Sequence, residues 1–214
     1  MYRIVIDTET TNSLEEPIAY DIGWAIIDED YNAVKTESYA IAEVFTDNEF
    51  MSSAYYADKV PFYWDDIFNG SRKLARLATV VRALNADIKA YGVTEVYAHN
   101  ARFDYRSTTL TQRYITSSKY YFMLPKNVTF FDTLKMSRQA FAKDPIYIDF
   151  CKTNGFMTKH KVPRPRLTAE VIYRFLTGDT NFTEAHQGLA DVLIEKEILK
   201  ACRERGVTGG ELWG

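Results

Sequence analysis

Five stretches rich in apolar, β-branched and aromatic residues predict the strands of a sheet: 2–6, 18–28, 36–44, 94–100 and 127–133. The second and third are joined by the short polar segment DEDYNAV, which predicts an antiparallel hairpin. The first ends directly at two acids, Asp7 and Glu9. An ionised carboxylate next to a buried strand requires a compensating partner.

Apolar residues at helical spacing from Leu74 to Ile88 predict a helix over 71–92, with Ser71 as its N-cap and Gly92 as its C-cap. Similar patterns predict the further helices 101–115, 133–143, 167–178 and 189–206. Asp132 is interpreted as the N-cap of the helix that follows it. Two segments lack any period: 48–70 is predicted to be an irregular insertion, and 158–166 a basic, proline-containing loop.

This order of elements predicts an α/β fold: a mixed sheet that begins with a hairpin, continues with parallel strands, and is flanked by helices on both faces. A length of 214 residues suits one domain. We expect that domain to span 1–206, with the insertion at about 48–70 and a flexible tail at 207–214. In such sheets, functional sites lie beyond the carboxyl ends of the strands.

Composition limits the partners and the cellular compartment that we expect for the protein. The net charge of −3 gives no overall basic field that would attract a polyanion, although acids that hold divalent cations are neutralised in use. The two cysteines, Cys151 and Cys202, form no disulfide or metal-binding pattern and indicate a reducing compartment. No apolar run is long enough to span a membrane, and a strand begins at once after the N-terminus. We therefore expect a cytoplasmic protein without a membrane partner.

Asp7 and Glu9 are two positions apart in an extended segment, so their side chains should share one face. Two carboxylates on one face repel each other, and a divalent cation such as Mg²⁺ between them relieves the repulsion. A surface pair beside a turn is the alternative, and the chain holds a second Asp-x-Glu, at 47–49, in a loop-like setting.

Two later motifs carry further acids. In YAHNARFD, Asp104 comes four residues after Asn100, where a strand gives way to a helix. In AHQGLAD, His186 precedes the last helix and Asp191 lies within it. A neutral imidazole there is a candidate general base, because its pKa lies near working pH. Taken singly, Asp104 and His186 are also explained as helix-terminus residues.

Taken in order, Asp7-Thr8-Glu9, His-Asn-x-x-Phe-Asp ending at Asp104, and His186-x-x-x-x-Asp191 resemble the motifs of the DEDDh family of 3′–5′ exonucleases. This family includes proofreading subunits, ribonuclease T and oligoribonuclease. The segments FFDTLKMSR and YRFLTGD are also similar to the family's intervening regions. The resemblance implies a ribonuclease H-like fold and hydrolysis of phosphodiester bonds at the 3′ end of single-stranded nucleic acid.

The resemblance also implies roles for these residues. Asp7, Glu9, Asp104 and Asp191 would hold two divalent cations, Mg²⁺ or Mn²⁺, with Asp7 bridging both. His186 would take a proton from the attacking water. Thr8, Thr10 and Asn100 would contact the terminal nucleotide. Two divalent ions stabilise both the attacking and the leaving oxygen of a phosphodiester.

Several alternatives stay open. The aromatic residues of 48–70 either stack on bases or form a hydrophobic cluster; they are Phe50, Tyr55, Tyr56, Phe62, Tyr63, Trp64 and Phe68. The basic residues of 158–166 either bind a phosphate backbone or form a solvated face; they are Lys159, His160, Lys161, Arg164 and Arg166. DNA is slightly favoured over RNA as substrate. The alternatives are an RNA-trimming or short-oligonucleotide exoribonuclease and a non-catalytic nucleic-acid-binding module. Two protein partners also stay open, a second copy of the chain in a homodimer and a polymerase or other replication protein.

Overall fold

The computed structural model describes residues 1–214 except 12–15, 53, 55, 118–122 and 214. Its sheet contains β1 (Arg3–Thr11), β2 (Ile18–Ile27), β3 (Ala33–Ile41), β4 (Lys73–Ala75), β5 (Glu95–Ala98) and β6 (Thr129–Asp132), in the spatial order β4-β3-β2-β1-β5-β6. The strands β1, β2 and β3 pair antiparallel, whereas β5 joins β1, β6 joins β5 and β4 joins β3 in parallel. This arrangement confirms the predicted mixed sheet that begins with a hairpin.

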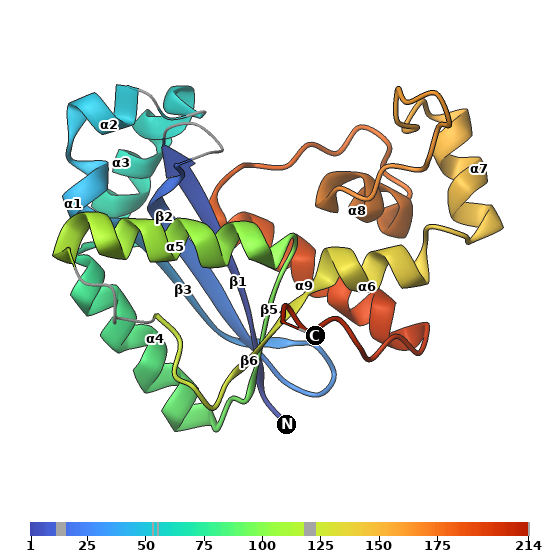
Figure 1. Cartoon of the computed structure of the whole chain (residues 1–214). Helices are drawn as coiled ribbons and strands as arrows, with labels where there is room; N and C mark the ends of the chain where they lie inside the picture. Colours follow the sequence, from blue (N-terminus) through green and yellow to red (C-terminus); the bar gives the residue numbers. More distant parts are fainter. Residues whose placement is uncertain (12–15, 53, 55, 118–122, 214) are drawn as a thin grey trace.

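Helices cover both faces of this sheet (Figure 1). They are α1 (Ala42–Phe45), α2 (Asn48–Ser52), the 3₁₀ helix η1 (Ala57–Lys59), α3 (Val60–Asn69), α4 (Leu77–Tyr91), α5 (Ala101–Thr116), α6 (Thr133–Ala140), α7 (Pro145–Thr153), α8 (Ala169–Thr177) and α9 (Gly188–Glu204). The helices α7 and α8 lie beyond α6 and α9, away from the sheet (Figure 1). Among the described residues, no helix combines the length and the apolar character needed to cross a membrane.

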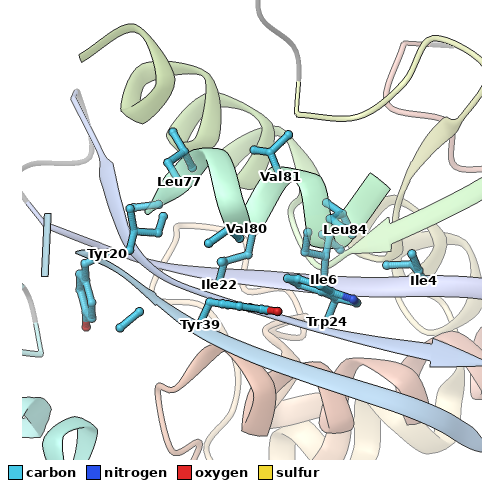
Figure 2. Packing of buried hydrophobic residues seen from close by; sticks show 14 of the residues in the cluster. Ile4, Ile6, Tyr20, Ile22, Trp24, Tyr39, Leu77, Val80, Val81 and Leu84 are labelled. Carbon is cyan, nitrogen blue, oxygen red and sulfur yellow. The ribbon is translucent and has the colours of Figure 1, made fainter. Parts of the chain in front are cut away.

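Alternation along β1 divides the core into two layers. Ile4 and Ile6 pack on the face covered by α4, in a cluster that also contains Leu77, Val80 and Leu84 (Figure 2). Val5 points to the opposite face, into the cluster that contains residues of α6, α8 and α9. Asp7 and Glu9 continue the alternation of Val5, so they lie on the α9 face of the sheet.

The start of α9 crosses β2 at very short range, and two glycines permit it. A Cβ on Gly23 would lie 2.3 Å from the backbone nitrogen of Leu189, and a Cβ on Gly188 would lie 2.8 Å from the nitrogen of Gly23. Neither atom can be accommodated without moving the backbone. This close crossing brings the first turn of α9, which carries Asp191, next to β1.

The predicted helix over 71–92 is wrong in its first part. Residues Lys73–Ala75 form β4, which pairs with the end of β3, and α4 begins only at Leu77 with Arg76 as its N-cap instead of Ser71. Pairing with the sheet edge therefore outweighs local helix propensity at these residues. The predicted C-cap is confirmed, because Gly92 adopts the left-handed conformation with φ 61°.

The segment 48–70 is largely helical, in contrast to the irregular insertion predicted. Its helices α2, η1 and α3 are short, which explains why no period was visible. Tyr63 is fully buried in the core cluster, and Phe50 and Trp64 pack against it. These three side chains form a hydrophobic cluster, as one of the two interpretations predicted, while Tyr55 lies outside the described residues.

The tail at 207–214, which we expected to be flexible, is hydrogen-bonded to β6 at residues 210–212. The backbone nitrogen of Leu212 donates to the carbonyl of Phe130 at 2.7 Å, and the nitrogen of Asp132 donates to the carbonyl of Gly210 at 2.8 Å. The side chain of Leu212 is buried. The tail thus runs along β6 and belongs to the fold.

Two predicted helix boundaries are confirmed at the atomic level. The Asp132 carboxylate accepts a hydrogen bond from the backbone nitrogen of Leu134 at 2.8 Å and so caps α6. Gly178 ends α8 in the left-handed conformation. By contrast, the sequence pattern gave no indication of α7, which Asp144 caps.

Candidate functional site

A cavity of about 670 Å³ opens beside β1, at the carboxyl end of β5 and the start of α9. Acids and one candidate base line part of it: Asp7, Glu9, Glu184, His186, Asp191 and Glu195. Basic residues from α6 and from the basic loop line another part: Arg138, His160, Arg164 and Arg166. The cavity therefore has an acidic part and a basic part.

The two acids of β1 meet the acids of α9 in this cavity. Burial and the carboxylates of Glu195 and Asp104 raise the pKa of Asp7 well above its ordinary value. Burial and the carboxylate of Asp191 raise the pKa of Glu9 in the same way. The ionised acids are therefore destabilised in the protein alone and would be stabilised by a positive charge between them.

Asp104 lies in the first turn of α5 and is fixed by Thr8. The Thr8 hydroxyl donates to Asp104 Oδ1 at 2.9 Å and lies 3.0 Å from the hydroxyl of Ser107. Burial raises the pKa of Asp104 to about 7. The Thr8 hydroxyl is itself buried in these contacts and orients Asp104, while contact of Thr8 with the terminal nucleotide stays a prediction.

Asp191 lies within reach of Glu9 and His186. One potential ligand atom from each of these three residues lies within 4.8 Å of the others. Asp191 Oδ2 accepts from the backbone nitrogen of Gln187 at 3.0 Å, whereas its buried Oδ1 accepts no hydrogen bond from a donor group in the described part of the chain. An unsatisfied carboxylate oxygen in an oxygen-rich cluster fits a hard divalent cation.

His186 belongs to this cluster and also contacts the insertion. Its backbone is in the left-handed region with φ 53°, and its ring stacks on Tyr56 with the centroids 4.0 Å apart and the planes at 10°. Burial lowers the pKa of His186, which favours the neutral imidazole that a general base requires. Among the described aromatic residues of the insertion, Tyr56 thus reaches the candidate site.

Sequence reasoning missed two acids of the cavity, Glu184 and Glu195. Burial raises the pKa of Glu184 to about 7 and that of Glu195 well above its ordinary value. Glu195 is buried and accepts the backbone N–H of His99 at 3.1 Å. Its signal was present in the sequence, since Glu195 follows Asp191 by four residues and so shares its helix face.

Three further residues named from the sequence are Asn100, Thr10 and His99, and they differ in how they relate to the cavity. Asn100 lines the cavity with its backbone at φ 66°, and its nitrogen donates to Asp132 Oδ1 at 3.0 Å. Thr10 is half-buried after the irregularity that separates it from Glu9 in β1, and it is not among the described residues that line the cavity. His99 is structural: its ring lies 3.0 Å from the Thr133 hydroxyl and 2.8 Å from the Leu167 carbonyl.

Comparisons with known proteins agree with this fold. No protein-family model matches the chain, and no curated protein matches it in sequence. Among solved structures, the zinc-bound complex of E. coli exonuclease I with single-stranded DNA has a TM-score of 0.62 at 15% identity, covering 95% of this chain and 40% of that one. Exonuclease I from Methylocaldum szegediense gives the same values. A full-length 3′-exonuclease has a TM-score of 0.59 at 13% identity, covering 96% of this chain and 61% of that one.

This chain thus spans about 40% of the length of the exonuclease I structures it resembles. At this level of identity the likeness establishes the fold, which is the mixed α/β sheet of ribonuclease H-like exonucleases. The fold predicted from the sequence is confirmed.

The buried acids predict how stability depends on pH and on metal. With pKa values near 7 for Asp104 and Asp191, the folded chain binds more protons than the unfolded chain between about pH 4 and pH 7. Without metal, we expect the melting temperature to fall as the pH rises through this window. Added Mg²⁺ favours the ionised acids, so it should raise the melting temperature more above this window than at its lower end.

Thermal melts at several pH values, with Mg²⁺ and with chelator, measure both effects. Asp191→Asn should flatten the fall with pH, whereas Asp149→Asn, at an exposed acid on α7, should leave it unchanged. Equal Mg²⁺ effects at both ends of the pH window would show that the buried acids are not the ion's ligands.

Proposed function

We propose that this protein is a metal-dependent 3′–5′ exonuclease that removes nucleoside monophosphates from the 3′ end of single-stranded nucleic acid. The observation that carries the proposal is the convergence of Asp7, Glu9, Asp191 and His186 on one cavity, with Asp104 behind it. The fold is that of solved exonucleases, one of which was determined with single-stranded DNA. Asp104 and Asp191 lie in the first turns of α5 and α9, and Asp7 and Glu9 lie within β1.

The acids fit a pair of divalent cations, Mg²⁺ or Mn²⁺. Asp7 is the proposed shared ligand, as the family resemblance implies, and its charge interacts with acids of both α5 and α9. Glu9 and Asp191 form one side and Asp104 the other. When bound, such ions stabilise the charge that develops on the attacking and leaving oxygens of a phosphodiester.

The remaining groups of the cavity serve the nucleic acid. Arg138, Arg164 and Arg166 line the same cavity as the acids and are suited to hold the phosphates of the strand. Asn100 offers an amide to the terminal nucleotide. The basic loop at 158–166 is therefore proposed as a phosphate contact instead of a solvated face.

His186 is proposed to accept the proton of the attacking water. Replacing it with alanine should slow hydrolysis roughly 100- to 10,000-fold, the range for loss of a general base. Mn²⁺ binding, followed by calorimetry, should remain close to that of the original protein, because carboxylates supply the ligands. A variant that loses Mn²⁺ binding along with activity would make His186 a ligand instead of a base.

The proposal is tested by digestion of 3′-labelled and 5′-labelled strands with Mg²⁺ and with chelator. Release of labelled monophosphate from the 3′ end, only with Mg²⁺, is the expected result. Binding of the strand without any metal-dependent release would favour the non-catalytic alternative. The four acids argue against that alternative, because unneutralised carboxylates repel a polyanion.

A side-by-side digestion of single-stranded DNA, duplex DNA, RNA and dinucleotides assigns the substrate. DNA is our first expectation. Preference for RNA or for dinucleotides would instead identify an exoribonuclease that trims RNA or degrades short oligonucleotides. The choice depends on contacts with the sugar 2′ position.

A further inference from the structure

A second cavity, of about 580 Å³, lies beside the candidate site. Asn100, Leu134 and Arg138 line both cavities, so the second continues from the first along the starts of α5 and α6. Its other walls come from the same two helices and from the tail: Arg102, Asp132, Lys135, Leu212 and Trp213. We call this second cavity the tail groove.

The tail groove is positively charged. Arg102 and Arg138 are exposed and form no ion pair within the described part of the chain. Lys135 adds a third cation. The carboxylate of Asp132 is already engaged, because its Oδ1 accepts the backbone N–H groups of Asn100 and Leu134. Cations without partners beside a nucleic-acid site are suited to phosphates.

The tail groove also presents an aromatic ring on a fixed backbone. Trp213 is 68% exposed, and its indole touches the rest of the fold through an edge contact with Tyr105, with ring centroids 5.1 Å apart. The preceding residue, Leu212, is hydrogen-bonded to β6, and the Lys135 ammonium donates to the carbonyls of Glu211 and Leu212 at 2.9 and 3.2 Å. An exposed indole held in place in this way is suited to stacking on a base.

We propose that the tail groove binds the single-stranded nucleic acid next to the nucleotide being removed, with phosphates at Arg138 and Arg102 and a base on Trp213. The inference rests on the proposed function, because the groove is defined by its continuity with the candidate active site. It extends that function by assigning a binding site for longer strands. We expect the terminal nucleotide to occupy the first cavity and the nucleotides that precede it to occupy the tail groove.

The test compares a single strand of about twelve nucleotides with a dinucleotide for the original protein and for Trp213→Ala. Loss of one base stack should lower the ratio of kcat/KM for the long strand over that for the dinucleotide roughly 5- to 150-fold. Trp213→Phe should restore most of the ratio. Phe68→Ala, at an exposed aromatic residue on α3, is the matched control and should leave the ratio unchanged.

Arg102→Gln gives an independent readout. It should reduce the slope of log KM against log salt for the long strand by about 0.7, the value for one phosphate contact on a single strand. If Trp213→Ala leaves the kcat/KM ratio unchanged and Arg102→Gln leaves the salt slope unchanged, the tail groove does not bind the strand. That result would leave the exonuclease assignment intact. If the original protein neither binds nor cleaves any strand, the proposed function itself fails.

Discussion

Replacing Asp7 with asparagine should reduce phosphodiester hydrolysis by roughly 1,000-fold or more and, without metal, make the protein more stable. The first effect follows because a ligand shared by two ions would be lost, which removes several kcal/mol of charge stabilisation. The second follows because burial and neighbouring acids raise the pKa of Asp7, so its ionised form opposes folding at neutral pH. The acid is thus expected to be retained for function at the expense of stability.

The two effects are measured on the same preparation, by strand digestion with Mg²⁺ and by thermal melts with chelator. Asp47→Asn is the matched control, because Asp47 and Glu49 form the other Asp-x-Glu of the chain and lie at the start of α2, outside the cavity. That variant should leave hydrolysis unchanged. Hydrolysis at the original rate in Asp7→Asn would remove Asp7 from the proposed metal site.

Strand alternation explains why the β1 part of the site could be predicted. Asp7 and Glu9 lie on the face of the sheet that carries Val5, opposite to Ile4 and Ile6, as a period of two requires. The strand itself extends to Thr11, so the acids lie within it and not after it. That extension leaves their shared face unchanged.

Other parts of the site depend on contacts that no local pattern records. The tail reaches β6 through backbone hydrogen bonds, and these bonds impose no pattern on the side chains. The stacking of Tyr56 on His186 joins residues 130 positions apart. The short helices of 48–70 contain too few turns for a period to be seen. Distant contacts, not local propensity, decide these features.

Asp21 is a further residue whose role emerged only from the structure, although it lies inside the apolar run of β2. It is fully buried. Its carboxylate pairs with Arg72 and accepts the Tyr63 hydroxyl at 2.7 Å and the backbone nitrogen of Gly188 at 2.8 Å. The Arg72 guanidinium also lies 3.9 Å from the centre of the Tyr63 ring. One carboxylate thus joins α3, the approach to β4 and the start of α9.

Replacing Asp21 with alanine should destabilise the protein by about 3–5 kcal/mol, because the buried Arg72 would lose its buried partner and keep only the partly exposed Asp66 at 3.5 Å. For a chain of this size, that loss lowers the melting temperature by roughly 6–20 °C. Removing both charges in Asp21→Asn with Arg72→Met should restore part of the stability, since no unpaired charge is then buried. Lys73→Met, which removes an exposed partner of Glu37 on the neighbouring residue, is the control and should change stability by no more than about 1 kcal/mol.

The same variant should also affect the candidate site, because Asp21 holds the backbone of Gly188 three residues before Asp191. Well below its melting temperature, Asp21→Ala should bind Mn²⁺ more weakly than the original protein, while Lys73→Met should bind it equally well. In the Asp21→Asn, Arg72→Met variant, asparagine can still accept the Gly188 N–H. We therefore expect its Mn²⁺ affinity to return to that of the original protein, even if its stability recovers only in part. If Mn²⁺ affinity instead followed stability alone in all three variants, Asp21 would support the fold without positioning α9.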